Sequence, residues 1–297
     1  MSWYTPRRII GVNRISSFVR LIRKGKVKDI YELQNGNLLF HFTDRISAFD
    51  IEMETPIPGK GEILCKFAEF WFSALGTNNH RIKTHDKDKL EVKKMEMIPI
   101  ECVVRGFLYG GLFERYKQNE TSLSLPTSFE PIQACKLPVP IFDPTTKSQN
   151  HDRPVSEQEI IGSGILSERD FEYLKEASLS LYCKMSEVVE KAGFILADVK
   201  FEFGRDLETT DLLLGDSLGP DEFRLWLKDD YGPGRVQKSY DKQILRDWLA
   251  ETGFKDILMN DDKIGEKHLP PRLPASLVAD LISRYSLAYE KISGSRL

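Results

Sequence analysis

The sequence of 297 residues predicts an α+β protein built of two lobes. Strand-like patterns gather before residue 110 and again at 194–217, and helical patterns lie between these regions and after the second. Because strands and helices do not alternate regularly, a doubly wound parallel sheet is not expected. We place the division between the lobes near residue 100, within the stretch 97–110.

The strand predictions begin with a hairpin. Residues 27–33 and 38–42 are β-rich, and the Asn35-Gly36 pair between them is a strong hairpin signal. Further runs of β-type residues lie within 81–108, notably at 90–97 and 100–104. The last two predicted strands cover residues 194–203 and 212–214.

Helices are predicted from apolar periodicity and from residues that begin or end a helix. Ser167 with Asp170 resembles a capping box, and Gly193 suits the end of the same helix. The predicted helices cover residues 63–75, 110–118, 167–192, 239–251 and 274–292. Residues 119–155 are rich in Pro, Ser and Thr and are expected to form long loops.

The start of the chain, residues 1–28, carries basic side chains and no acidic one. Ile15, Phe18, Val19 and Ile22 follow helical spacing, which predicts a first helix with a solvated basic face. An organelle transit peptide is the alternative for such a start. We expect the helix, and a cytoplasmic protein.

The composition limits the classes of function. Hydrophobic residues make up 41% and charged residues 29% of the chain, as in an ordinary globular protein. The net charge of −3 gives no general attraction to nucleic acid or a membrane, so an anionic ligand needs a local group of basic side chains. The four cysteines are widely spaced, which favours reduced thiols over a zinc site. No apolar run approaches the ~18 residues of a membrane helix.

Asp198, Lys200 and Glu202 form the most informative pattern. Side chains alternate along a strand, so these charged groups share one face and the apolar residues between them share the other. A solvated edge strand is the alternative interpretation. The run continues the apolar residues 194–197, however, which indicates a central strand whose charged face lines a cleft.

A second acidic residue, Asp216, follows the apolar strand at 212–214. Glu202 and Asp216 at neighbouring strand ends would repel each other. A hard cation would relieve the repulsion, and oxygen ligands suit Mg²⁺ together with phosphate. The pair is therefore a candidate magnesium site.

Two basic motifs are weaker signals. Lys26 and Lys28 follow Gly25 at the start of the hairpin, where backbone amides and ammonium groups can lie over a polyphosphate; a turn with solvated lysines is the alternative. Arg105 ends an apolar strand and needs a partner there. That partner is either an anionic ligand or Glu101.

Read together and in order, several segments resemble the phosphoribosylaminoimidazole-succinocarboxamide synthase (SAICAR synthetase) family. They are GKVKDIYEL, TDRISAFD, IPIECVVRG, PTTK with HDRPVS, ADVKFEFG, PDEFRLW and SYDKQILRDWL. IPIECVVR and the D-x-K-F-E-F-G pattern are specific to that family. The resemblance extends over about residues 25 to 293.

The resemblance implies a two-lobed α+β fold whose nucleotide site lies between the lobes, like that of protein kinases and ATP-grasp proteins. Residues 1–100 would form a β-rich nucleotide-binding lobe, and residues 101–297 a lobe that binds substrate and metal. The implied enzyme is a carbon–nitrogen ligase of purine biosynthesis with ATP and Mg²⁺ as cofactors. It joins carboxyaminoimidazole ribonucleotide to L-aspartate through an acyl phosphate. Its partners are small molecules, not nucleic acid or a membrane, and its oligomeric state stays open.

The resemblance also implies roles for individual residues. Lys26 and Lys28 would lie at the ATP phosphates, and the chain from Lys93 to Met97 would face the adenine. Lys200 would contact the reacting groups, with Asp198 orienting Lys200 or the amine. The implied metal ligands are Glu202 and Asp216, and the implied substrate-binding residues are Ser47, Asp50, Arg105, Arg224, Lys242 and Arg246. His151 would order its loop.

The chain departs from the family pattern on the acceptor-substrate side. Gly111 stands where the family usually has Ser after Gly, and Ser217 and Gly219 stand where Asp-Glu-x-Ser/Thr-Pro-Asp is usual. Either backbone amides of the Gly-Gly turn replace the lost groups, or the substrate differs. We favour replacement because Arg105, Arg224 and Asp50 are all retained.

The alternatives to the implied ligase fall into three classes. The first is a paralogous ATP-dependent amide ligase acting on another carboxylate or amino acid. The second is a small-molecule phosphotransferase, and the third is a nucleotide-binding protein without catalysis. The intact set of Asp198, Lys200, Glu202 and Asp216 argues against the third.

Overall fold

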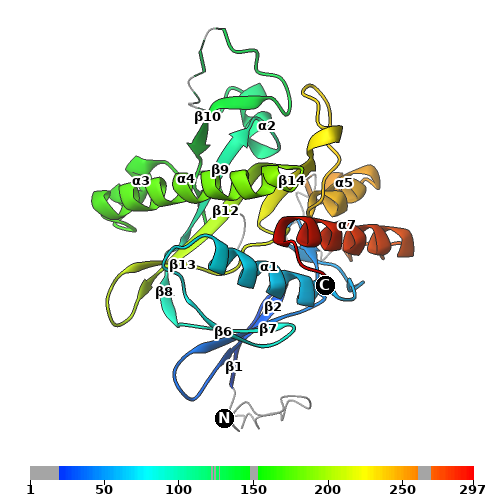
Figure 1. Ribbon diagram of the computed structural model, residues 1–297. Coiled ribbons are helices and arrows are strands. Elements are labelled where there is room, and N and C mark those ends of the chain that lie inside the picture. Colours follow the sequence, from blue (N-terminus) through cyan, green and yellow to red (C-terminus); the bar gives the residue numbers. More distant parts are fainter. Residues whose placement is uncertain (1–19, 122, 124, 127, 148–152, 260–268) are drawn as a thin grey trace.

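The computed structural model describes residues 20–121, 123, 125–126, 128–147, 153–259 and 269–297. Two antiparallel sheets form its framework (Figure 1). The first has five strands in the order β1-β2-β3-β7-β6. Their bounds are Arg20–Lys24, Lys28–Glu32, Leu38–Phe42, Lys89–Val92 and Arg81–Asp86, in that order.

The predicted hairpin is confirmed as β2 and β3. The side-chain amides of Asn35 and Asn37 both donate to Glu91 Oε1 on β7, at 2.9 and 2.7 Å. The turn is thus held to the next strand of the sheet by a carboxylate that is 3% exposed. A separate pair of short strands follows, β4 (Ser47–Ala48) and β5 (Ile51–Glu52).

The second sheet is built around β12 (Phe194–Asp206), the longest strand. One half of β12 pairs with β9 (Ile100–Phe107) and β14 (Phe223–Leu227). The other half pairs with β13 (Leu212–Gly215) and β8 (Met95–Met97). β10 (Lys136–Phe142) and β11 (Thr145–Thr146) both pair with β9.

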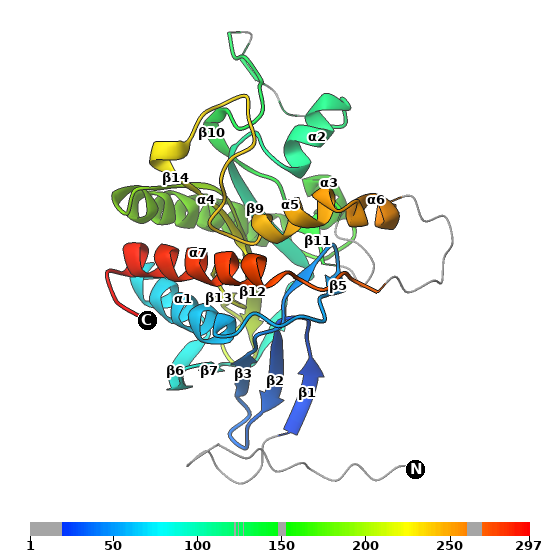
Figure 2. The same cartoon turned by 90° about the vertical axis from the view of Figure 1, so that its right-hand side faces the viewer.

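Two long helices cover these sheets. α1 (Lys60–Ala74) contacts β3, β6 and β7 of the first sheet, and α4 (Glu168–Lys191) packs on β12 and β9 of the second. α7 (Ala275–Ser293) lies alongside α1 (Figure 2). The shorter helices are α2 (Gly111–Lys117), α3 (Glu157–Gly162), α5 (Gln243–Glu251), α6 (Phe254–Met259) and the 3₁₀ helix Lys228–Asp230.

Most predicted elements agree with these bounds. Ser167 caps α4 by accepting from the Asp170 amide at 3.1 Å, and Gly193 takes the left-handed conformation at the end of this helix. The predicted helix at 15–22 is wrong where it can be compared: Ile22 lies in β1, and residues before 20 lie outside the described part of the chain. Residues 119–155 are not all loop, because β10 and β11 lie among them.

One buried core runs through both sheets. It includes Phe40 and Leu90 of the first sheet, Phe67 and Trp71 of α1, and Phe201 of the second sheet. Sheet membership changes between β7 and β8, at residues 93–94. The division of the chain at residue 100 into a nucleotide lobe and a substrate lobe stays a prediction.

Candidate active site

The charged face of β12 is the centre of the candidate site. Lys200 Nζ donates to Glu101 Oε1 on β9 at 2.5 Å and lies 3.6 Å from Glu202 Oε1. Lys147, just beyond β11, donates to the other oxygen of Glu202. Burial opposes the charge on Lys200, but the carboxylates of Glu202 and Glu101 outweigh it and raise the pKa of this ammonium above its usual range. Lys200 is 30% exposed and therefore within reach of a ligand.

Asp216 lies next to this face because β12 and β13 are neighbours. Glu202 pairs with Gly215 in the β12–β13 register, and Asp216 follows directly. Lys28 Nζ donates to Asp216 Oδ1 at 2.5 Å and to Ser217 Oγ at 3.1 Å. Burial alone would raise the pKa of Asp216, but the ammonium groups of Lys28 and Lys147 hold it well below its usual range.

A second group of charges surrounds Asp198 on the same strand. Arg224 of β14 donates to Asp198, and Arg105 Nη1 of β9 lies 3.8 Å from it. Arg105 also donates to Asp143 at 2.5 Å, as does Arg115 at 2.6 Å. Arg105 therefore pairs with Asp143, and Lys200 donates its hydrogen bond to Glu101 rather than to Asp198.

Gly110 allows Arg224 to approach the start of α2. This glycine has a φ of 56°, and a Cβ there would lie 3.0 Å from Arg224 Nη2. A side chain would therefore be both strained and crowded. Gly111 has open space around its Cα, so the Gly-Gly turn leaves room beside the guanidinium group.

Lys26 and Asp50, from separate predicted motifs, meet at the surface. Lys26 Nζ donates to Asp50 Oδ1 at 2.6 Å, and both side chains are about half exposed. Phe49 and Asp50 have φ values of 50° and 63° in the turn between β4 and β5. Ser47 is buried at 6% exposure in β4.

The predicted adenine segment lies along the other end of β12. Met97 pairs with Gly204 in the β8–β12 register and is 39% exposed. Lys93 donates to Asp206 at 2.5 Å. Its ion pairs within the described ranges are with Asp206 and Glu208, not with the charged face of β12.

Lys242 lies in a buried ionic cluster that the sequence did not predict. Its Nζ is 3.7 Å from Asp221 Oδ2, which also accepts from Lys60 at 2.8 Å. Tyr285 of α7 donates to the other oxygen of Asp221 at 2.9 Å. Burial lowers the pKa of Lys242. Arg246 lies on α5, one turn further along from Lys242.

Several residues at the site were not predicted from the sequence to be functional. Lys147 belongs to the PTTK segment but received no role, and Glu101 was considered only as a partner of Arg105. Glu222 Oε1 accepts from Ser217 Oγ at 3.2 Å, and its Oε2 is buried without a hydrogen-bond partner among the described atoms. Burial, and then the Asp221 carboxylate, raise the pKa of Glu222. His151 lies outside the described residues.

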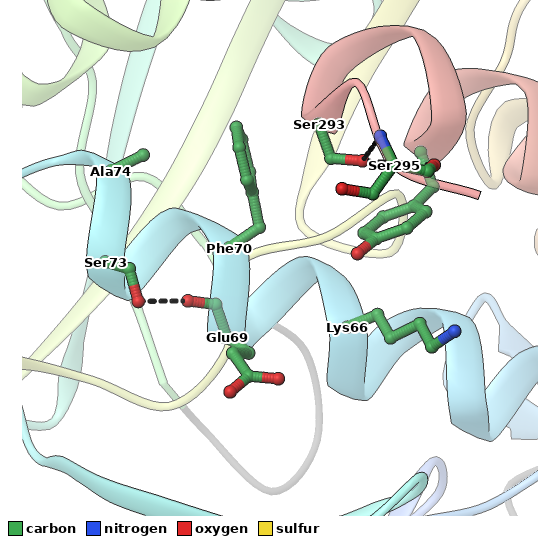
Figure 3. A pocket seen from close by; sticks show the side chains of 8 residues that line it. Lys66, Glu69, Phe70, Ser73, Ala74, Ser293 and Ser295 are labelled. Atoms are coloured by element: carbon green, nitrogen blue, oxygen red, sulfur yellow. Dashed lines mark hydrogen bonds between the residues drawn. The ribbon is translucent and has the colours of Figure 1, made fainter. Parts of the chain in front are cut away.

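Two surface pockets lie apart from the predicted site. Figure 3 shows one of about 410 Å³ between α1 and the end of α7, where Lys66 and Phe70 face Ser293 and Ser295. The other, of about 300 Å³, is next to the start of α1 and includes His41 and Gly61. Neither is lined by a residue that the sequence predicted for the site.

The protein is thus an α+β protein in which carboxylates and cations are paired along one face of a central strand. Comparison with known proteins identifies the family. The family model described as SAICAR synthetase matches residues 21–260. The chain belongs to the SAICAR synthetase family.

Individual relatives support this membership over nearly the whole chain. A phosphoribosylaminoimidazole-succinocarboxamide synthase of Nitrosopumilus maritimus is 45% identical over 279 residues, which are 94% of this chain and 100% of the relative. The synthase of Corynebacterium ammoniagenes is 38% identical over 93% of this chain and 94% of its own length.

Solved structures agree with the fold. The SAICAR-synthase from Saccharomyces cerevisiae complexed with SAICAR has a TM-score of 0.79 and 32% identity, with 99% of each chain covered. A type-2 SAICAR synthetase in complex with ADP has a TM-score of 0.70 and 26% identity, covering 94% of this chain and 99% of its own. Within the described residues, no helix is both long and apolar enough to cross a membrane.

Proposed function

We propose that this protein is an ATP- and Mg²⁺-dependent ligase that joins carboxyaminoimidazole ribonucleotide to L-aspartate. One observation carries the proposal beyond family membership: β12 and its neighbours bring Asp198, Lys200, Glu202 and Asp216 together with four cations. The cations are Lys28, Lys147, Arg105 and Arg224. Substrates with a triphosphate, a 5′-phosphate and carboxylates need such a group of cations.

The reaction proceeds in two steps. A substrate carboxylate oxygen attacks the γ-phosphorus of ATP, the bond to the β–γ bridging oxygen breaks, and ADP leaves. The amine of aspartate then attacks the carbonyl carbon of the acyl phosphate, phosphate leaves, and the nitrogen loses a proton. Positioning and charge neutralisation account for most of the catalysis of phosphoryl transfer.

The chain's own residues have distinct parts in this proposal. Lys200 neutralises charge at the transferred phosphoryl group, and Glu101 fixes its ammonium. Lys28 reaches the ATP phosphates from β2. Arg105 and Arg224 bind the ribonucleotide phosphate, with Asp198 orienting both guanidinium groups.

Glu202 and Asp216 fit a Mg²⁺ ion by the chemistry of their oxygen donors. Each carboxylate holds a lysine ammonium in this structure, so each already attracts a cation. Within the described ranges, no group of three His, Cys, Asp or Glu side chains is arranged to hold an ion alone. Mg²⁺ commonly takes one or two carboxylates and completes its shell with water and substrate phosphates. When bound, the ion would neutralise charge on the ATP phosphates.

Ser47, Asp50, Lys242 and Arg246 are proposed to contact the imidazole ribonucleotide and the substrate carboxylates. Lys26 and the chain from Lys93 to Met97 are proposed to contact ATP. We also place the protein in the cytoplasm.

Measuring ADP release by the purified protein tests the proposed function. Release is expected only when ATP, Mg²⁺, the ribonucleotide and aspartate are all present. Release without an amino acid would indicate a phosphotransferase. Faster release with another amino acid, or indifference to the 5′-phosphate, would indicate a paralogous ligase.

Arg105→Gln gives a sharper test of the phosphate site. Losing a hydrogen bond to an anion corresponds to about ten- to hundredfold in binding, so the KM for the ribonucleotide should rise by that factor. The KM for ATP should change little. Arg205→Gln is the matched control, because Arg205 is on the same sheet but pairs with Asp170 instead. An equal rise in both variants would contradict the assignment.

A further inference from the structure

Asp216 has a left-handed backbone conformation, which requires stabilising contacts. Its φ is 56°, in the left-handed region that residues with a Cβ seldom adopt. Such a conformation is unfavourable for a residue with a Cβ and persists only where the surroundings fix it. It turns the chain directly after β13 and so decides where the Asp216 carboxylate lies.

His80 contacts Asp216 from the first half of the chain. Its ring Nε2 lies 3.2 Å from the Asp216 carbonyl oxygen. A carbonyl oxygen only accepts hydrogen bonds, so Nε2 carries the proton and donates. The hydrogen bond therefore restrains the peptide unit whose carbonyl belongs to Asp216.

His80 is itself firmly placed. Its side chain is 2% exposed and packs edge-on between Phe40 and Phe72, with ring centroids 5.5 and 5.2 Å away. Its backbone amide donates to Leu214 of β13 at 3.0 Å, and its carbonyl accepts from Lys93 at 2.7 Å. Residues 78–80 thus run beside β13 while remaining joined to the first sheet.

Phe40 connects this ring to the charges of the site. Lys28 Nζ lies 4.7 Å from the centroid of Phe40, a cation–π distance, and also donates to Asp216 Oδ1. His80, Phe40, Lys28 and Asp216 therefore form a closed loop of contacts. His80 holds the backbone of Asp216, and Lys28 holds its carboxylate.

We propose that His80 is a positioning residue that sets the direction of the Asp216 carboxylate and thereby the binding of magnesium-bound nucleotide. The proposal rests on the proposed function, in which Asp216 is a magnesium ligand. His80 has no contact with substrate in this proposal, because its ring is buried between Phe40 and Phe72.

The test compares two substitutions of His80. Phenylalanine in His80→Phe keeps an aromatic ring between Phe40 and Phe72 and removes the donor. Glutamine in His80→Gln restores an N–H at similar reach. The measured quantity is the ratio of the ADP dissociation constants without and with Mg²⁺, obtained by calorimetry in EDTA and in saturating MgCl₂.

Loss of one hydrogen bond corresponds to about fivefold in an equilibrium. His80→Phe should therefore lose about fivefold of the Mg²⁺-dependent gain in ADP affinity, while its affinity in EDTA stays within about twofold. His80→Gln should recover most of the gain. An unchanged Mg²⁺-dependent gain in ADP affinity in His80→Phe would overturn the proposal. So would an equal loss of this gain in both variants that is proportional to the decrease in their melting temperatures.

Two further measurements separate this proposal from the proposed function. Nitrogen-15 NMR of the unmodified protein should show His80 protonated at Nε2, and a proton on Nδ1 alone would overturn the proposal without any variant. Asp216→Asn should abolish the Mg²⁺-dependent gain; if it does not, Asp216 is no magnesium ligand, and the positioning role of His80 fails while the ligase reaction can still stand. If the wild-type protein releases no ADP with the ribonucleotide and aspartate but the His80 series behaves as expected, only the proposed ligase reaction fails.

Discussion

At the scale of single residues, the proposed role of Lys200 is in the reaction rather than in substrate binding. Its ammonium is held between Glu101 and Glu202 on the charged face of β12. A cation held in this way needs no reorganisation when charge develops on a phosphoryl group. ATP itself has further contacts through Lys28 in the proposed arrangement, so its binding depends less on Lys200.

Lys200→Ala should therefore lower kcat by about 10²- to 10³-fold. The dissociation constant for ATP should change by less than about threefold. Arg205→Ala is the control, because it removes a cation from the same strand that pairs with Asp170 instead. Normal turnover with weaker ATP binding in Lys200→Ala would contradict the catalytic role.

Glu91 gives a prediction about pH. Burial would raise the pKa of this carboxyl, but hydrogen bonds from Asn37, Asn35 and His85 outweigh burial and lower the pKa to about 2. The ordinary value is 4.5. A depressed pKa means that the native state favours the carboxylate, so its stabilising effect is complete above the unfolded value and is lost as the pH falls towards 2.

The effect at neutral pH is about 3 kcal/mol at most, from the difference between the two pKa values. Carbon-13 NMR should show Glu91 still ionised at pH 3. Asn37→Ala removes one hydrogen-bond donor and should therefore raise the pKa of Glu91. Titration of Glu91 near 4.5 in the unmodified protein would show that the three hydrogen bonds do not stabilise the carboxylate.

At the scale of elements, the loop between β13 and β14 contains linked departures from the family pattern. A Cβ on Gly219 would lie 3.3 Å from Leu64 Cδ2 and 3.4 Å from Glu222 Oε2. Glu222 in turn accepts from Ser217. The small residue at 219 and the carboxylate at 222 therefore share one space.

Gly219→Ser should destabilise the protein by about 1–2 kcal/mol, because the crowded neighbours must move. In a Glu222→Ser background the cost should be smaller, with a coupling of about 0.5–1 kcal/mol in a double-mutant cycle measured by urea unfolding. Gly111→Ser is the control, since a Cβ there meets nothing within 4 Å. Strictly additive changes in the free energy of unfolding would show that the side chains at 219 and 222 do not share this space.

The local sequence patterns predicted most strands and helices, and the two wrong predictions have identifiable physical causes. Ile22 follows helical spacing, but pairing of β1 with β2 decides its conformation. β10 contains Pro138 and Pro140, which obscure a strand pattern; the strand is at a sheet edge, where proline is tolerated. Pairing between distant segments overrides local preference in the first case and permits an unfavourable residue in the second.

The same limit applies to the candidate site. The alternation along β12 was enough to place Asp198, Lys200 and Glu202 on one face. The partners Glu101 and Lys147 come from other segments, and only the fold brings them to that face. The contact of His80 with the backbone of Asp216 likewise exists only in the fold. A single sequence carries no signal for such contacts.

At the scale of the whole molecule, a buried ionic cluster joins elements that are far apart in the chain. Lys60 at the start of α1 is fully buried and donates to Asp221 in the β13–β14 loop. Tyr285 of α7 donates to the same carboxylate. The cluster thus links the helix on the first sheet, a loop of the second sheet and the C-terminal helix, within one continuous core.

Lys60→Met should lower the free energy of unfolding by about 3 kcal/mol, because it leaves the buried Asp221 carboxylate with less compensation. Lys66→Met is the control on the same helix: Lys66 forms a partly exposed pair with Glu62 at 3.4 Å, and pairs near the surface contribute less than about 1 kcal/mol. Since one core spans both sheets, Lys60→Met should shift the unfolding of both together in urea, whether followed by tryptophan fluorescence or by circular dichroism. Equal costs for the two substitutions would mean that the buried pair contributes no more than a surface one. Two separated transitions would mean that the sheets unfold independently despite their shared core.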